Sequence, residues 1–313
     1  MAGRRKTFWT LLKLGFSVGV LAWVLSRFDL ASIARHLRHA AWPWLAVAFA
    51  LNAVGLLIRA YRWRILALAR GDDLPIAFLF RSCLIGEFFN SFLPTNFGGD
   101  AYRIWDGSRQ SRSLVRSSAI VIVERMSGIL ILLFFAVIAS LLRLDMVRRV
   151  PLIAVSLLLG IGGFAVLGLF FLPAVGRRLQ RPPAAGPLRK AMIKAAEFRS
   201  VIVGYRDHPR DFLRATAWAF LLQLNVILYY FLIGRALGLR VPALDYFVFI
   251  PLVLLIQLLP ISINGLGVRE VAYIEIFKFY GVAGEMALSF SIIGIAFGLL
   301  VSVVGGILLA TRK

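Results

Sequence analysis

The hydrophobic positions of this chain fall into long runs that are separated by short basic segments. Six runs are uninterrupted: Thr7–Ser26, Trp42–Ile58, Ser118–Leu142, Pro151–Leu172, Ala215–Ile233 and Ala287–Ala310. About 20 apolar residues in a helix cross the hydrocarbon core of a bilayer, which is about 30 Å thick. The pattern therefore predicts about six membrane-spanning helices.

Two further apolar runs, at 76–94 and 244–261, end in breaks rich in proline and glycine. The break residues are Pro94, Gly98 and Gly99 in the first run and Pro260, Gly265 and Gly267 in the second. Proline removes a backbone donor, and glycine lets the backbone turn. Irregular backbone at membrane depth is tolerated where it is buried in protein or lines a water-filled cavity. The two runs therefore predict re-entrant, broken helical segments.

The two breaks share one spacing, P-x4-G-x3-R, which ends at Arg103 in the first and at Arg269 in the second. Interrupted hydrophobic segments in corresponding positions of two halves point to the binding site of a transporter. We therefore expect a first repeat at about 42–142 and a second at about 215–310. A basic cytoplasmic loop at about 176–214 would join them.

Composition places the whole chain in the membrane. Hydrophobic residues make up 60% of the 313 positions and charged residues only 16%, against about 25% charged in soluble domains. We expect one integral membrane domain over 1–313, an all-α polytopic fold. One cysteine excludes an internal disulfide framework, and three histidines leave no histidine-based metal cluster. The sequence predicts no metal and no cofactor.

The net charge of +21 sits mainly beside the apolar runs, which indicates membrane topology rather than a nucleic-acid partner. Placing both termini in the cytoplasm puts 23 Lys and Arg in cytoplasmic segments and 10 outside. This agrees with the positive-inside rule for an inner membrane of the bacterial type. The interrupted segments then enter from opposite sides, as an inverted-topology repeat. A cleaved signal peptide is the alternative for the first run, but no small-x-small site follows it.

Ionisable and amide groups cluster at the two breaks. The candidates for substrate binding are Glu87, Asn90, Asp100, Arg103, Glu124, Arg125, Asn264, Arg269 and Glu270. A charge inside a bilayer costs at least about 2–3 kcal/mol and usually faces a cavity or a partner. Mutual ion pairing that holds the bundle together is the structural alternative, but a polar cavity between the repeats accounts better for the whole set.

These groups suit a phosphate-bearing headgroup. Glycine-rich breaks that open into helices leave unpaired N–H groups, which favour phosphate. Arg103 and Arg269 add fork-shaped donors for a phosphodiester. Glu124 and Glu270 could pair with those arginines in the empty protein, or meet a cationic headgroup in the loaded one. The chain contains no P-loop, G-x-S-x-G, H-E-x-x-H or C-x-x-C motif, so we do not expect an enzyme.

Three motifs carry a resemblance to a known family. They are FFNSFLPTNFGGDAYR at 88–103, ERMSGILILL at 124–133 and LPISINGLGVRE at 259–270. Together they resemble the lysylphosphatidylglycerol synthase transmembrane region, or flippase-like, family, in a stand-alone member without the aminoacyltransferase domain. The resemblance implies an inner-membrane protein with re-entrant helices that moves an amphiphilic lipid between leaflets. Lipid aminoacylation is not expected without the transferase domain.

The sequence thus favours a lipid flippase that moves a phosphate-containing phospholipid, hopanoid or polyprenyl-linked lipid. One alternative is an integral-membrane transferase that acts on a lipid phosphate. Another is a non-transporting scaffold for a lipid-synthesis or glycosyltransferase enzyme, with the basic loop as its docking surface. The expected partner is a membrane lipid, and an oligomer is compatible with the sequence.

Overall fold

The structure is a computed structural model, and the residues that it describes are all in helices or short connections. It describes residues 29–93, 97–179, 186, 189, 192–193, 195–196, 199–200, 203–205, 207–258, 262 and 265–312. The helices are α2 Leu30–His39, α3 Trp42–Leu68, α4 Ile76–Phe92, α5 Gly98–Ser111, α6 Leu114–Leu142, α7 Leu144–Arg149, α8 Pro151–Phe171, α9 Pro173–Leu179, α11 Pro209–Ala236, α12 Ala243–Leu258, α13 Val268–Lys278 and α14 Gly284–Ala310. Over these residues the all-α prediction is confirmed.

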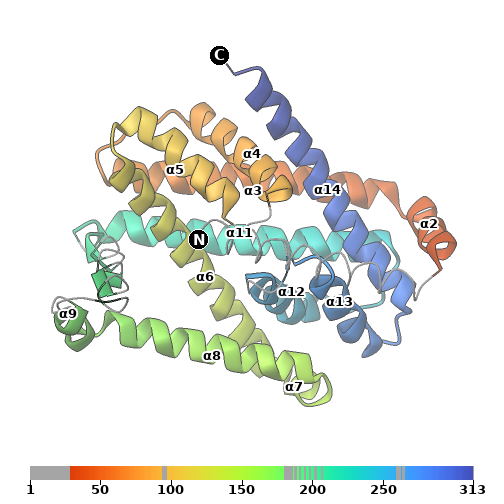
Figure 1. The fold of residues 1–313 in the computed structure, drawn as a ribbon. Coiled ribbons are helices and arrows are strands. Elements are labelled where there is room, and N and C mark those ends of the chain that lie inside the picture. Colours follow the sequence, from red (N-terminus) through yellow and green to blue (C-terminus); the bar gives the residue numbers. More distant parts are fainter. Residues whose placement is uncertain are drawn as a thin grey trace.

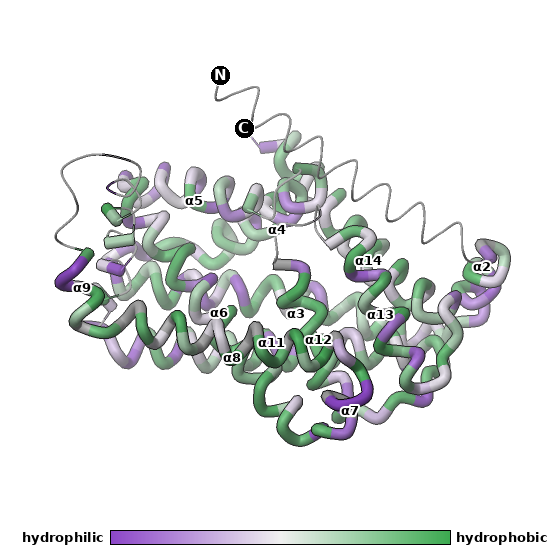
Figure 2. The backbone as a smooth tube through the Cα atoms, turned by 60° about the horizontal axis from the view of Figure 1, so that its bottom comes forward, coloured by the Kyte–Doolittle hydropathy of each residue, from purple (hydrophilic) through white to green (hydrophobic). Residues whose placement is uncertain are grey.

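Four helices in the described part of the chain are long and apolar enough to cross a membrane: α3, α6, α11 and α14. The predicted span at 151–172 also forms one continuous helix, α8, of 21 residues. Hydrophilic positions gather in the short helices α7 and α9 at its two ends (Figure 2). The predicted span Thr7–Ser26 lies outside the described residues, as does much of the basic loop at 176–214.

Helix α3 is longer than the sequence pattern predicts. We expected the apolar run to end at Ile58 and a basic cytoplasmic segment to follow from Arg59, and the helix continues without a break to Leu68. Buried Ala60 and Trp63 keep the helical spacing of apolar residues beyond Arg59. The residues after Ile58 are therefore helical, and their cytoplasmic location stays a prediction. Helix α11 likewise begins at Pro209, six residues before the predicted span.

Helices α3 and α11 pack side by side in opposite directions (Figure 1). The amide of Ala41, just before α3, donates to the carbonyl of Ala236 at the end of α11, with N···O 2.8 Å. Toward the other end, the rings of Tyr61 and Trp218 meet edge to face with centroids 4.8 Å apart. The C-terminal ends of these two helices therefore lie at opposite ends of the bundle.

The chain after α3 folds into a helical hairpin, α4–α5, with its tip near Gly99. Phe89 on α4 stacks on Tyr102 of α5 with ring centroids 5.0 Å apart. At the tip, the amide of Gly99 donates to Oδ1 of Asn90, with N···O 2.8 Å. A Cβ at Gly99 would overlap the carbonyl oxygen of Gly86. Only glycine allows the two arms to approach this closely.

The chain after α11 folds into a second hairpin, α12–α13. Phe249 on α12 meets Phe277 on α13 with centroids 5.4 Å apart, and Tyr280 donates to Asp245, with O···O 2.7 Å. Near the tip Gly265 has φ +74°, a left-handed conformation that favours glycine. Since α3 and α11 are antiparallel, the two hairpins enter the bundle from opposite ends. In Figure 1 one hairpin lies above the α3–α11 pair and the other below it.

The helices that follow α3 and α11 occupy matching positions in the sequence. Arg269 lies 166 positions after Arg103. Shifting the bounds of α4 by 166 gives 242–258, and α12 spans Ala243–Leu258. The same shift brings α3 close to α11 and α6 close to α14. The spacing of the two motifs thus extends to whole helices.

One ion pair to a buried aspartate ties each hairpin to the other half of the chain, and we name the two the reciprocal Arg–Asp pairs. Arg143, just after α6, pairs with Asp245 of the second hairpin. Arg312, just after α14, pairs with Asp106 of the first hairpin, with N···O 2.8 Å. Both aspartates are 1% exposed or less. Each half of the chain therefore supplies an anchor for the hairpin of the other half.

Candidate functional site

The tips of both hairpins reach one cavity of about 600 Å³ in the middle of the bundle. Helices α3, α4, α5, α6, α11, α12, α13 and α14 all contribute to its wall. Its ionisable lining residues are Arg59, Arg62, Glu87, Asp100, Arg103, Glu124, Arg125 and Arg269. Apolar side chains of α6, α11, α12 and α14 complete the wall. The site thus combines charged and lipid-compatible surfaces.

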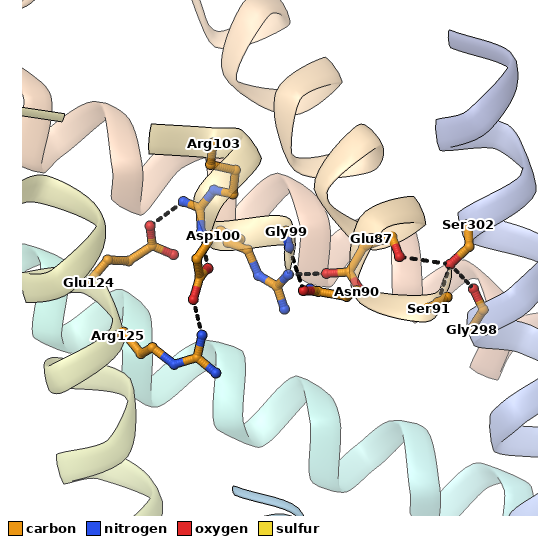
Figure 3. Close-up of polar contacts among 11 residues, drawn as sticks. Glu87, Asn90, Ser91, Gly99, Asp100, Arg103, Glu124, Arg125, Gly298 and Ser302 are labelled. Carbon is orange, nitrogen blue, oxygen red and sulfur yellow. Dashed lines mark hydrogen bonds and ion pairs between the residues drawn. The ribbon is translucent and has the colours of Figure 1, made fainter. Parts of the chain in front are cut away.

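The charged wall near the first hairpin is a chain of ion pairs (Figure 3). Arg103 pairs with Glu124 and lies 3.6 Å from Asp100. Asp100 in turn pairs with Arg125 of α6. The guanidinium of Arg103 also lies over the ring of Trp63, 4.4 Å from its centroid. Arg103 and Glu124 are only 4% and 5% exposed, so their mutual pairing offsets a large cost of desolvation.

Two arginines of α3 add to this wall. Arg59 pairs with Glu87 of α4. Arg62 is 2% exposed and donates only to neutral oxygens: the carbonyl of Ala215 at 3.2 Å, the carbonyl of Glu124 at 2.9 Å and Oγ of Ser127 at 2.9 Å. Within the described residues, Arg62 has no carboxylate at ion-pair distance. Its direct contacts among the described residues are therefore neutral, although the carboxylate of Glu124 is close enough to attract it.

On the opposite side of the cavity, Arg269 pairs with Glu270, with N···O 3.0 Å. Glu270 itself does not line the cavity and is 1% exposed. Its carboxylate accepts from the amide of Gly267 at 2.7 Å and from Oγ of Ser291 at 2.7 Å. Glu270 thus caps the start of α13 and holds the guanidinium of Arg269 at the cavity wall.

The structure brings most of the predicted site residues together. Glu87, Asn90, Asp100, Arg103, Glu124, Arg125 and Arg269 all line the cavity. The expected pairing of Glu124 with Arg103 and of Glu270 with Arg269 is confirmed. Three of the predicted residues, Pro94, Pro260 and Asn264, lie outside the described residues.

One expectation about the glycine-rich breaks is wrong. We expected their N–H groups to be unpaired and available to phosphate. The amide of Gly99 instead donates to Asn90, and the amide of Gly267 donates to Glu270. At these two positions the protein satisfies its own donors, which leaves the guanidinium groups as the charged donors of the cavity wall.

Sequence reasoning missed Arg59, Arg62, Ser91, Gln223 and Gln257, which also line the cavity. The two arginines were assigned to a solvated segment because they end the apolar run. The continued period of buried Ala60, Trp63 and Ala67 could have shown that the helix goes on. The amides lie singly within apolar helices, where spacing alone does not show which way they face.

The balance of charge favours an anionic ligand. Five arginines and three carboxylates line the cavity among the described residues, and Glu270 behind Arg269 brings the acidic groups to four. One positive charge is left over in a site whose most buried charged groups are Arg62, Arg103 and Glu124, and burial strengthens electrostatic attraction. No group of three or more His, Cys, Asp or Glu in the described part of the chain has a metal-binding arrangement.

Comparison with known proteins agrees with this architecture. The family described as the lysylphosphatidylglycerol synthase TM region matches residues 10–306. No curated protein and no solved structure matches the chain. The family match includes both hairpins, every ionisable residue of the cavity wall, and all of the eight surrounding helices except the last four residues of α14. The chain is therefore a multi-pass membrane protein that belongs to the lysylphosphatidylglycerol synthase transmembrane region family.

Proposed function

We propose that this protein is a lipid translocase that moves a phosphate-containing lipid between the leaflets of a bacterial-type inner membrane. The observation that carries the proposal is the central cavity, whose wall is both cationic and apolar and lies between two opposed hairpin tips. A phosphate headgroup would sit against Arg103 and Arg269 while the tails stay in lipid. Guanidinium groups suit this task because they bind phosphate oxygens through two parallel hydrogen bonds.

The distribution of charge supports an orientation with both termini in the cytoplasm. Arg59, Arg62 and Arg103 line the cavity on the side counted as cytoplasmic, and Arg269 lines it on the outer side. Without these four arginines, the cytoplasmic segments still hold 20 Lys and Arg and the outer segments hold 9. The positive-inside bias therefore does not depend on the cavity arginines.

The arrangement of the hairpins supports alternating access by an inverted-topology repeat. In transporters of this kind, broken helices from two oppositely oriented repeats meet at a central site, and one repeat rocks against the other. Here α4–α5 and α12–α13 would be the re-entrant elements of repeats at about 42–142 and 215–310. The reciprocal Arg–Asp pairs would close the route from the cavity to either side of the membrane.

The test is lipid flipping in vesicles that contain the purified protein and a fluorescent phosphatidylglycerol. Arg269→Ala removes a guanidinium from the cavity wall and should abolish flipping. Because it also leaves buried Glu270 without its counterion, flipping is compared per amount of protein that remains folded in detergent. Arg240→Ala removes an exposed arginine outside the cavity and should flip lipid at the wild-type rate. Wild-type flipping by Arg269→Ala would reject the assigned role.

The same preparation separates the other two functions that the sequence left open. A transferase would change the mass of the lipid, which mass spectrometry of the extracted lipids would detect. A scaffold would flip no lipid, and it would respond to charge reversal in the basic loop rather than to substitutions in the cavity. A wild-type protein without flipping activity would overturn the proposal.

A further inference from the structure

A second chamber of about 420 Å³ adjoins the main cavity, and we call it the side chamber. The two share Arg59, Glu87 and Gln257 in their walls. Apart from the Arg59–Glu87 pair, the described lining of the side chamber is uncharged. Its polar groups are amides and phenols: Asn52, Asn225, Gln257, Tyr229 and Tyr230. The chemistry of the site thus changes from ionic to neutral across one ion pair.

The amides around the two chambers are incompletely hydrogen-bonded within the described residues. Asn52 interacts with the hydroxyl of Tyr229 in the same wall, but its buried Nδ2 makes no hydrogen bond of good geometry there. The same is true of Nε2 of Gln223, which lines the main cavity and is 9% exposed. An unsatisfied buried polar group costs about 1–3 kcal/mol. Such groups in a cavity wall are a reason to expect a polar ligand there.

Two glycines keep the side chamber open. A Cβ on Gly55 would lie 3.1 Å from Oδ1 of Asn225, and a Cβ on Gly294 would lie 3.4 Å from Cε1 of Tyr230. The first contact is tight, so a side chain at position 55 would crowd the amide, whereas the second is an ordinary van der Waals contact. Glycine at position 55 therefore leaves room for the amide of Asn225 in the chamber wall.

The carboxylates around the cavity are all engaged by arginines. Glu87 pairs with Arg59, Asp100 with Arg125, and Glu124 with Arg103. An ammonium headgroup would have to break one of these pairs to find a counterion. A single negative charge, in contrast, would meet the guanidinium of Arg62, whose hydrogen bonds among the described residues go to neutral oxygens.

We infer that the lipid bound here is a monoanionic phosphodiester whose headgroup is uncharged and rich in hydroxyls, such as a glycerol or a sugar. This rests on the proposed function. The phosphate would lie in the main cavity and the hydroxylated group in the side chamber. A hydroxyl both donates and accepts hydrogen bonds, as do the amides that would meet it. The rings of Tyr229 and Tyr230 offer apolar faces to the carbon skeleton of the headgroup.

The test is competitive lipid binding to the purified protein, followed by native mass spectrometry. Phosphatidylglycerol and phosphatidylethanol carry the same single charge but differ in hydroxyls. Phosphatidylethanolamine replaces the hydroxyls with an ammonium group. We expect wild-type protein to prefer phosphatidylglycerol over either competitor by about tenfold, the effect of one or two lost hydrogen bonds to buried groups.

Variants test whether the side chamber sets the preference for phosphatidylglycerol and whether the main cavity binds the phosphate. Asn52→Leu and Asn225→Leu should reduce the preference for phosphatidylglycerol over phosphatidylethanol to about twofold or less, while binding of phosphatidylethanol itself is retained. Gln110→Leu, at an exposed amide of α5, should leave the preference unchanged. Arg62→Gln should lower the affinity for both anionic lipids by the same factor.

Three outcomes would overturn the inference, and they differ in what they mean for the proposed function. Equal binding of phosphatidylglycerol and phosphatidylethanol, with flipping intact, would reject the hydroxyl-rich headgroup and leave the translocase in place. Preference for phosphatidylethanolamine would reject the monoanionic ligand in the same way. Absence of both lipid binding and flipping would reject the inference together with the proposed function.

Discussion

The residues around the cavity show how a membrane protein can hold many charges at its centre. Arg103 and Glu124 are nearly fully buried and pair with each other, and Asp100 bridges Arg103 to Arg125. Each pair offsets part of the cost of removing the two charges from water. Arg62 lacks such a partner, and its neutral hydrogen bonds hold it in place without cancelling its charge. The network is therefore rigid and still cationic.

Glu124→Gln tests the strength of this network. The substitution keeps the size of the side chain but leaves the buried guanidinium of Arg103 without its closest counterion. Loss of one partner of a buried pair typically costs about 3–5 kcal/mol, so we expect a clear fall in the unfolding temperature in detergent. Glu275→Gln is the matched control, because the Glu275–Lys278 pair is exposed and is worth less than about 1 kcal/mol. Equal shifts in the two variants would contradict a stabilising role for the buried pair.

At the scale of single residues, the sequence predicts the charged cavity residues that lie next to a proline- and glycine-rich break. Arg103 and Arg269 can be identified because both end the same P-x4-G-x3-R spacing. Arg62 has no such signal, since its role comes from the direction in which it leaves a long helix. Its neighbours at the site come from helices far away in the chain, and only the packed structure brings them together.

At the scale of elements, the two hairpins are the part of the fold that the sequence predicts best. An apolar run that stops at proline and glycine cannot continue as a helix, so the position of each break can be predicted from the sequence. The end of α3 could not be predicted in this way, because arginine normally marks the edge of the membrane. Here Arg59 and Arg62 face an internal cavity instead, and the helix continues past them.

Gly99→Ala tests the close packing at the tip of the first hairpin. The added Cβ would overlap the carbonyl of Gly86, so the two arms would have to separate. Overpacking of this kind typically costs about 1–3 kcal/mol, and flipping should fall because Asp100 and Arg103 would shift with α5. Thermal unfolding and the vesicle assay would measure both effects.

The control for the hairpin tip is Gly162→Ala in α8, where a Cβ would meet nothing within 4 Å. This change should be neutral or slightly stabilising, since alanine favours helix more than glycine does. If Gly99→Ala were as well tolerated as Gly162→Ala, the two arms would not need their close approach.

At the scale of the whole molecule, the reciprocal Arg–Asp pairs lie where the two hairpins join the bundle. Arg312 also donates to the hydroxyl of Tyr102 at 2.6 Å, which fastens the base of the first hairpin. Asp245 accepts from Tyr280 as well as from Arg143, which fastens the base of the second. A transporter that opens one end at a time needs interactions that break at that end alone.

Removing one reciprocal pair should therefore open one end of the protein. Asp106→Asn combined with Arg312→Gln removes both charges and leaves neither aspartate nor arginine unpaired. We expect a cysteine at Leu222, in the cavity wall, to react faster with a membrane-impermeant thiol reagent added from the side of the first hairpin. Asp245→Asn combined with Arg143→Gln should give the same increase from the opposite side. The native Cys83 is buried and would be replaced by alanine.

The sidedness of labelling decides the outcome of this experiment. Opposite sides for the two double variants would support closure by the reciprocal pairs. Increased labelling from the same side in both, or from neither side, would contradict it. Arg240→Gln, at an exposed position, provides the baseline rate.

The reciprocal pairs also have a consequence for how the protein is made. Asp106 is synthesised early, yet the arginine that pairs with it follows 206 residues later. Until the last helix has inserted, the nascent chain carries an aspartate without this counterion, and burying it alone would cost free energy. The first half of a stalled or truncated chain would keep that exposed acid. We therefore expect membrane proteases and chaperones to distinguish an unfinished molecule from a finished one by a single aspartate that lacks its counterion.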